Sequence, residues 1–151
     1  MDGGARGNPG PAGFGVHLVD AGGDELAGLY GFLGATTNNV AEYAALLALL
    51  EHAASLKPAR LTVRSDSQLL IRQMRGEYKV KDARLKLLHA AAHRLAARFP
   101  AIVYEHVPRE ENRDADALAN RAMDERAGNA PVPQAVAAVS GQAATGRLPG
   151  L

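Results

Sequence analysis

Residues 36–43 read TTNNVAEY, and this stretch joins the two patterns that decide the fold. Before it, apolar residues alternate with small or polar ones over 14–19, and the turn DAGGD leads into a second extended run at 25–33. This alternation and its turn predict a β-hairpin. After it, a helix is expected from about Asn39, which can cap it, to Leu56, where a proline two positions later prevents continuation.

Beyond this helix, short strands and helices alternate. Strands are expected at 61–66 and 101–107, and helices at 67–75, 83–98 and 114–126, from apolar residues that recur at two-residue or at three- and four-residue steps. With a first strand beginning at Asp2, the order is β-β-β-α-β-α-α-β-α. This order predicts an α/β fold with a mixed sheet and helices packed on its faces.

The composition describes one modest domain. The chain has 151 residues, of which 47% are hydrophobic and none is cysteine, so a disulfide scaffold and cysteine-based sites are excluded. No apolar run reaches the roughly 18 residues that span a membrane, and no signal-peptide pattern opens the chain. We expect a soluble, cytoplasmic protein with no membrane partner. Composition changes after Arg126, so we expect a folded domain over 1–126 and a flexible low-complexity tail over 127–151.

The net charge of +1 gives no argument for nucleic-acid binding by itself. The distribution says more, because six Lys and Arg residues lie within 72–86 against two acidic residues. This basic stretch could contact a phosphate backbone. It could equally be a solvated helix face and loop.

Four carboxylates fall at strand ends or helix starts. Glu42 lies in the first turn of the expected helix, Asp66 ends a strand, Asp116 lies in the first turn of the last helix, and Asp2 precedes a glycine pair. Each alone has an ordinary explanation as a helix cap, a dipole-stabilising acid or a polar terminus. Together they form the oxygen-rich ligand set that Mg²⁺ prefers. Two such ions roughly 4 Å apart can activate water and stabilise the leaving oxygen of a phosphodiester.

Four sequence blocks resemble type 1 ribonuclease H, in that family's order. They are DGGARGNPGPAG at 2–13, TTNNVAEY at 36–43, SDSQ at 65–68 and ENRDADALAN at 111–120. The resemblance implies a ribonuclease H-like fold, with a mixed five-stranded sheet flanked by helices. It also implies an endonuclease that hydrolyses the RNA strand of RNA–DNA hybrids to 5′-phosphate and 3′-hydroxyl ends.

The resemblance further assigns site residues. It implies that Asp2, Glu42, Asp66 and Asp116 are the catalytic residues and bind two Mg²⁺ ions, which Mn²⁺ can replace. Asp116 is preferred to Asp114 because it precedes the LAN triplet as the family's last Asp does.

Substrate-binding residues carry over in the same way. Minor-groove contacts are implied for Asn8, Asn38, Asn39 and Gln68, and a DNA-phosphate contact for Thr37. A hybrid duplex exposes ribose 2′-hydroxyls in a wide minor groove, where short amides can donate and accept. Backbone contacts carry little sequence information, so weak sequence selectivity is expected.

The chain departs from the family pattern near its last helix. Many members carry a His in the loop that precedes this helix, whereas here the loop reads PREE at 108–111. His106 lies in the preceding strand and is not expected to substitute. Arg109 or Arg113 could assist instead by binding a phosphate, since an Arg cannot act as a base near neutral pH.

Two further departures concern the connection at 76–83 and the first strand. Some members have a basic helical protrusion where 76–83 crosses directly; there Tyr78 could stack near the DNA strand or pack against a helix. Only Met1 precedes Asp2, whereas members usually have several apolar residues there. We therefore expect the natural start to lie upstream, or the first strand to be compromised.

Three other functions stay open at this point. The chain could bind a hybrid or double-stranded RNA without cutting it, could be a different hydrolase on the same fold, or could be a fragment of a larger protein. His89 and His93 have the i, i+4 spacing of a zinc site but lack the Glu of a metalloprotease motif, so surface histidines are favoured. A monomer is expected.

Overall fold

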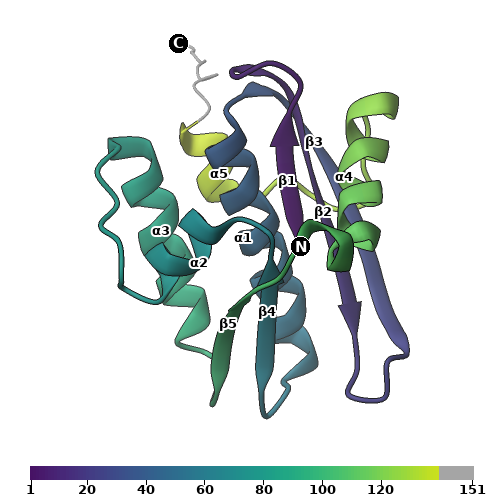
Figure 1. The fold of residues 1–151 in the computed structure, drawn as a ribbon, viewed down its shortest axis with the longest axis vertical. Helices are drawn as coiled ribbons and strands as arrows, with labels where there is room; N and C mark the ends of the chain where they lie inside the picture. Colours follow the sequence, from purple (N-terminus) through teal and green to yellow (C-terminus); the bar gives the residue numbers. More distant parts are fainter. Residues whose placement is uncertain (140–151) are drawn as a thin grey trace.

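The strands form two groups that meet at the start of the chain (Figure 1). A computed structural model describes residues 1–139. The antiparallel group has the order β1-β2-β3, and the parallel group pairs β4 with β5. The strand bounds are β1 (Asp2–Ala5), β2 (Gly10–Val19), β3 (Glu25–Thr36), β4 (Leu61–Ser65) and β5 (Ile102–His106). The amino group of Met1 donates to the carbonyl oxygen of Arg64 at 3.0 Å, which connects β1 to β4.

The predicted α/β class is confirmed, as are all five strands and their mixed pairing. The five strands do not form one continuous hydrogen-bonded sheet. Among the described residues, β1 pairs with β2 and β4 pairs with β5, and no ladder joins β1 to β4.

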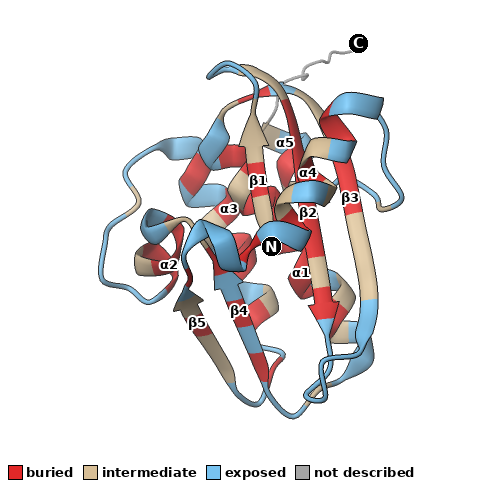
Figure 2. Ribbon diagram, turned by 45° about the vertical axis from the view of Figure 1, so that its right-hand side comes forward, coloured by how far each residue is buried: buried red, intermediate tan, exposed pale blue. Residues whose placement is uncertain are grey.

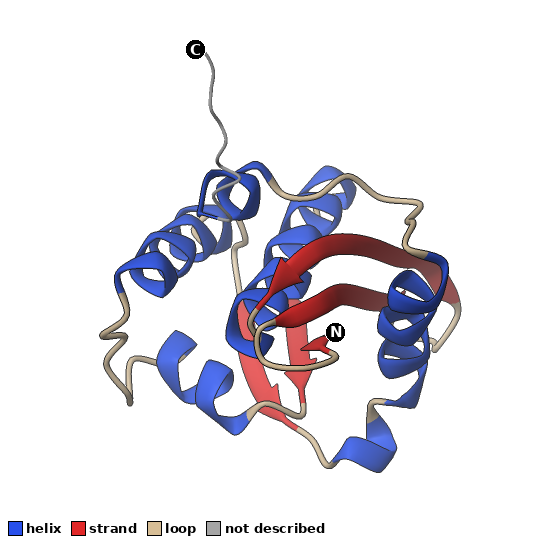
Figure 3. Cartoon of the chain, turned by 90° about the horizontal axis from the view of Figure 1, so that it is seen from above, coloured by secondary structure: helices blue, strands red, loops and turns tan. Residues whose placement is uncertain are grey.

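Helices cover both faces of the strands (Figure 3). The bounds are α1 (Asn38–Leu56), α2 (Gln68–Met74), α3 (Ala83–Ala96), the 3-10 helix η1 (Arg109–Glu111), α4 (Arg113–Glu125) and α5 (Gln134–Val139). Helix α1 packs on β1 and β2 and against α3, whereas α4 packs on β2 and β3. In the described residues, no helix is long and apolar enough to cross a membrane.

Helix α1 forms the centre of the core. Its predicted apolar side, Leu46, Leu47, Leu49 and Leu50, is buried, and so are alanines around most of its circumference. Figure 2 shows the buried positions gathered on α1 and β2. Such an almost fully buried helix is held rigidly, so the residues of its first turn are fixed relative to the strands.

The predicted cap of α1 is wrong by two residues. Thr37 is the cap, because its Oγ1 accepts from the backbone N–H of Val40 at 3.2 Å. Asn38 is the first helical residue, and its Oδ1 accepts from the backbone N–H of Ala5 at 2.7 Å. The tertiary contact with β1 therefore selects the helix start within TTNN.

The predicted tail is wrong for 127–139. The side chain of Asn129 accepts from the N–H of Tyr30 and donates to the carbonyl of Gly28, each at 2.8 Å. Helix α5 then places Val136 in the core, 1% exposed. This segment closes against β3 and α3, so the folded part continues past Arg126. The rest of the predicted tail, 140–151, lies outside the described residues.

Candidate active site

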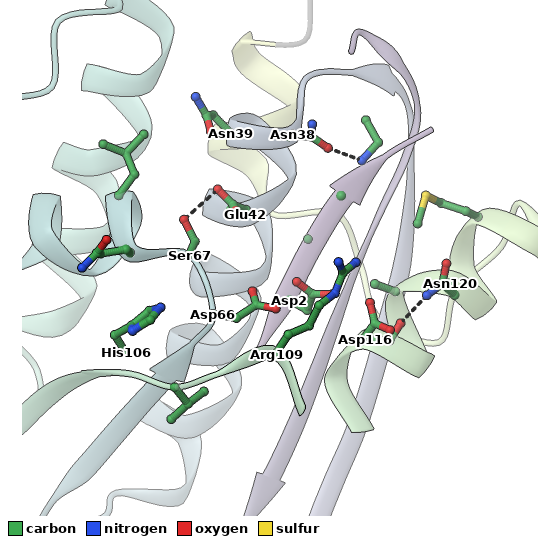
Figure 4. A pocket seen from close by; sticks show the side chains of 18 of the residues that line it. Asp2, Asn38, Asn39, Glu42, Asp66, Ser67, His106, Arg109, Asp116 and Asn120 are labelled. Atoms are coloured by element: carbon green, nitrogen blue, oxygen red, sulfur yellow. Dashed lines mark hydrogen bonds between the residues drawn. The ribbon is translucent and has the colours of Figure 1, made fainter. Parts of the chain in front are cut away.

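The four predicted carboxylates open onto one cleft of about 820 Å³ (Figure 4). We call it the carboxylate cleft, and Asp2, Glu42, Asp66 and Asp116 all line it. They come from four elements: the start of β1, the first turn of α1, the end of β4 and the first turn of α4. This placement agrees with the sequence prediction that the four carboxylates lie close together.

Two glycines let the helices approach the strands closely enough to form this cleft. A Cβ atom at Gly3 would overlap the carbonyl of Ala41, directly before Glu42. A Cβ atom at Gly15, the β2 partner of Asp2, would overlap the carbonyl of Ala115, directly before Asp116. The two glycines face opposite sides of the strands, so one admits α1 and the other admits α4.

Glu42 is linked to the N-cap of α2, which directly follows Asp66. Ser67 caps this helix, and its Oγ accepts from the backbone N–H of Leu70 at 3.3 Å. The same hydroxyl donates to Glu42 Oε1 at 3.1 Å. The Glu42 carboxylate therefore points toward α2 (Figure 4).

Burial makes the negative charge of this cleft costly. Burial, a hydrogen bond with Asp116 and repulsion from Asp66 raise the pKa of Asp2 to about 7. Burial, with repulsion from Asp2 and Asp66, raises the pKa of Glu42 to about 7, against the lowering effect of the Ser67 hydroxyl. A bound cation would remove this repulsion, and an all-carboxylate donor set suits a hard divalent ion.

The side chains are gathered but do not form a closed ligand shell. Within residues 1–139, no three His, Cys, Asp or Glu side chains are arranged to hold one ion. Glu42 is engaged with Ser67, whereas Asp2 and Asp116 share a hydrogen bond. The donor chemistry fits a divalent ion, and side-chain rotation would be needed to enclose it.

The predicted substrate residues fall into two groups. Asn38, Asn39 and Gln68 line the carboxylate cleft. Asn8 and Thr37 are not among its lining residues and instead stabilise the loop: Asn8 Oδ1 accepts from the N–H of Asn38 at 3.0 Å, and Thr37 caps α1. Asn8 thereby positions Asn38.

Three further side chains line the cleft: Arg6, to which the sequence assigned no role, Arg109, for which phosphate binding was suggested, and His106, which was not expected to substitute for the loop His. Arg6 lines it and is held by Asn120 at 3.2 Å and by Asp124 at 2.7 Å. Arg109 reaches toward Asp2 and Asp116, and His106 lies beside Asp66 (Figure 4). Arg6 lies within the motif DGGARGNPGPAG at 2–13, and this motif is the feature of the sequence that could have indicated a site role for it. His106 is brought in by β5, whose last residue pairs with Ser65.

The basic stretch at 72–86 is partly structural. Arg75 donates to the carbonyl of Tyr104 through Nε at 3.0 Å and Nη2 at 2.6 Å. The guanidinium of Arg72 lies 5.2 Å from the ring centre of Tyr78. Arg72 and Arg75 are therefore engaged within the protein, while Tyr78 remains half exposed.

A mixed α/β fold of this order, with an open acidic cleft between strand ends and helix starts, defines the ribonuclease H-like class. Residues 1–122 match the family described as Reverse transcriptase-like. The crystal structure of RNase H1 from Halobacterium salinarum superimposes with a TM-score of 0.79 at 43% identity, covering 82% of this chain and 94% of that one. The chain belongs to the type 1 ribonuclease H family.

Two more proteins are similar to this chain, one in structure and one in sequence. LC11-RNase H1, solved in complex with an RNA/DNA hybrid, has a TM-score of 0.79 at 45% identity and covers 83% of this chain and 94% of that one. Bifunctional protein Rv2228c of Mycobacterium tuberculosis is 47% identical over 130 residues, 85% of this chain. The chain spans only 36% of the length of that curated relative.

Proposed function

We propose that this chain is an endonuclease that hydrolyses the RNA strand of RNA–DNA hybrids to 5′-phosphate and 3′-hydroxyl ends. The observation that carries the proposal is the meeting of four carboxylates from four separate elements in one open cleft. The family membership and the RNA/DNA hybrid bound to LC11-RNase H1 support the choice of substrate.

Asp2, Glu42, Asp66 and Asp116 would hold two Mg²⁺ ions, which Mn²⁺ can replace. When bound, such ions activate a water molecule and stabilise the leaving oxygen of the phosphodiester. The chain itself controls the charge of the donor set. Because the pKa values of Asp2 and Glu42 are about 7, both carboxyls must lose protons before they can serve as full ligands.

Substrate recognition rests on the amides at the rim of the cleft. Asn38, Asn39 and Gln68 line it, and amides of this kind can donate to and accept from ribose 2′-hydroxyls. The Oδ1 of Asn38 is already used by Ala5, so its Nδ2 remains as the donor toward a groove. Arg109 lines the same cleft and is suited to binding a backbone phosphate.

A second function, hybrid binding without cutting, is favoured by one observation. In the described part of the chain, the carboxylates are not arranged as a closed metal shell. If the cleft cannot close around ions, the same amides and arginines would still bind a duplex.

The test is cleavage of an end-labelled hybrid with Mg²⁺ or Mn²⁺, beside matched RNA and DNA duplexes. Asp66→Asn and Glu42→Gln should each lower cutting by at least about 100-fold, as removal of a transition-state-stabilising group does. Glu51→Gln is the matched control, because Glu51 is an exposed acid on the same helix as Glu42. Tight binding without cutting by well-folded protein with either metal would favour the second function.

Two further sequence expectations remain predictions. A monomer would be checked by light scattering of the purified chain with and without hybrid. A cytoplasmic location would be checked by cell fractionation.

A further inference from the structure

Two histidines on α3 face the C-terminal end of α2, apart from the residues that line the carboxylate cleft. His89 Nε2 and His93 Nε2 are 3.2 Å apart, and His89 Nε2 lies 3.0 Å from the carbonyl oxygen of Gln73. His93 is exposed and His89 half-buried, so an ion can reach the pair from solvent. The two ring nitrogens therefore lie as close together as two ligands of one ion, and His89 also contacts the end of α2.

The spacing of the two nitrogens is close to that of two ligands on one ion. A tetrahedral Zn²⁺ with Zn–N bonds of about 2.0–2.1 Å places its nitrogen ligands roughly 3.3 Å apart. The observed separation is 3.2 Å. The ring centres are 4.4 Å apart with planes at 74°, so binding requires the rings to turn about χ2, which is a broad torsion.

Hydrogen bonding alone leaves His93 in the form that binds metals. The Gln73 carbonyl can only accept, so His89 Nε2 carries the proton and donates it, and His93 Nε2 accepts through a bare lone pair. Metal binding at His89 Nε2 moves this proton to Nδ1. Burial and the neighbouring His89 also lower the pKa of His93, which favours neutral imidazole. Neutral imidazole is the ligand form for Zn²⁺.

The contact of His89 with α2 fixes where the pair lies. The Gln73 carbonyl at the C-terminal end of α2 already accepts from the N–H groups of Arg75 and Gly76, so it is not needed as a metal ligand. The side chain of Gln73 is fixed by the hydroxyl of Tyr43 at 2.7 Å, so the residue beside His89 is held in place.

We propose that His89 and His93 bind a structural divalent ion of the Zn²⁺ type, with water completing the shell. The ion replaces the hydrogen bond between the two imidazoles and joins two successive turns of α3. The site is separate from the carboxylates and its existence does not depend on the proposed nuclease activity.

The test titrates ZnCl₂ into the chelator-treated full chain by calorimetry, with saturating Mg²⁺ present to occupy the carboxylate cleft. One zinc equivalent should still bind. At a free Zn²⁺ concentration about 100 times Kd, mass action should raise Tm by roughly 5–10 °C. His93→Ala should lose both effects, while His93→Cys, which keeps a ligand atom, should retain them.

His52→Ala is the control, because this histidine lies on α1 and makes no side-chain hydrogen bond within the described residues. It should bind zinc like the unmodified chain. Melting each variant in chelator gives its metal-free baseline, so misfolding cannot imitate loss of the site. Equal zinc binding by His93→Ala and the unmodified chain would overturn the proposal. So would zinc binding that Asp66→Asn abolishes and His93→Ala retains, since it would assign the ion to the cleft.

Discussion

Two buried tyrosines provide a matched test of how α1 is fixed to α2. Tyr43 is 1% exposed and its hydroxyl donates to Gln73 Oε1 at 2.7 Å. Tyr104 is 8% exposed, and among the described residues its hydroxyl has no hydrogen-bond partner. Tyr→Phe removes the same oxygen atom at both positions, so any difference in stability reports the hydrogen bond and its surroundings.

The two substitutions should have opposite effects. Tyr43→Phe leaves the buried Gln73 oxygen without a donor, which should lower the free energy of unfolding by about 1–3 kcal/mol. Tyr104→Phe removes a buried hydroxyl that makes no hydrogen bond within the described residues. This substitution should leave the free energy of unfolding unchanged or raise it by about 1 kcal/mol. The expected gap is therefore about 1–4 kcal/mol, and about 1.4 kcal/mol corresponds to a factor of ten in the unfolding equilibrium.

Urea unfolding followed by circular dichroism measures this gap, provided that the slope with denaturant is the same for all variants. The double variant Tyr43→Phe with Gln73→Leu adds a second check, because replacing both partners by apolar groups of similar shape should recover much of the loss. The reasoning is refuted if Tyr43→Phe costs no more than Tyr104→Phe. It is also refuted if Gln73→Leu recovers nothing in the Tyr43→Phe background.

Four other predictions test the cleft and the domain boundary. The raised pKa values of about 7 for Asp2 and Glu42 mean that the folded protein binds more protons than the unfolded chain between about pH 4 and pH 7. The free energy of unfolding of the metal-free protein should therefore fall as pH rises through this window, and Mg²⁺ should raise Tm more at pH 8 than at pH 5. Gly15→Ala should displace α4, lower the unfolding free energy by about 1–3 kcal/mol and reduce hybrid cleavage, as urea unfolding and the cleavage assay would show. Asn129→Ala removes both side-chain bonds to β3 and should cost about 1–3 kcal/mol by urea unfolding, whereas a truly flexible tail would give no change. Arg109→Ala should weaken hybrid binding and reduce the salt slope of log Kd by about one, as fluorescence anisotropy at several salt concentrations would detect.

The regular elements could be predicted because their signals are local. The alternation in 14–19 and the leucines of α1 report burial directly, so the hairpin and the long helix follow from spacing. The start of α1 could not be predicted in the same way. TTNN offers four adjacent residues that can cap a helix, and the choice of Thr37 depends on Asn38 bonding to Ala5 in another strand.

The domain boundary was misplaced for a related reason. Residues 127–139 are rich in Ala, Gly and Pro, a composition shared by flexible linkers and by segments that pack closely. What distinguishes them is one side chain, Asn129, whose amide matches two free backbone groups of β3. That complementarity is invisible without the strand beside it.

The same limit applies to the glycines of the first two strands. In the sequence, Gly3 opens a turn-rich stretch and Gly15 alternates with apolar residues in the expected hairpin, so neither position indicates contact with a helix. In the fold, each marks a point where a helix backbone touches a strand, directly before a cleft carboxylate. The motif blocks identified the carboxylates as a set, but only the packing explains why they can meet.

That packing also links the proposed metal binding to pH. Close helix approach buries Asp2 and Glu42, and burial, with repulsion between neighbouring carboxylates, raises their pKa values to about 7. The Ser67 hydroxyl on Glu42 offsets part of this effect. Under the proposed function, a divalent ion would compensate the remaining negative charge once both carboxyls have lost their protons. Binding of Mg²⁺ to the carboxylate cleft should therefore strengthen as pH rises through 7.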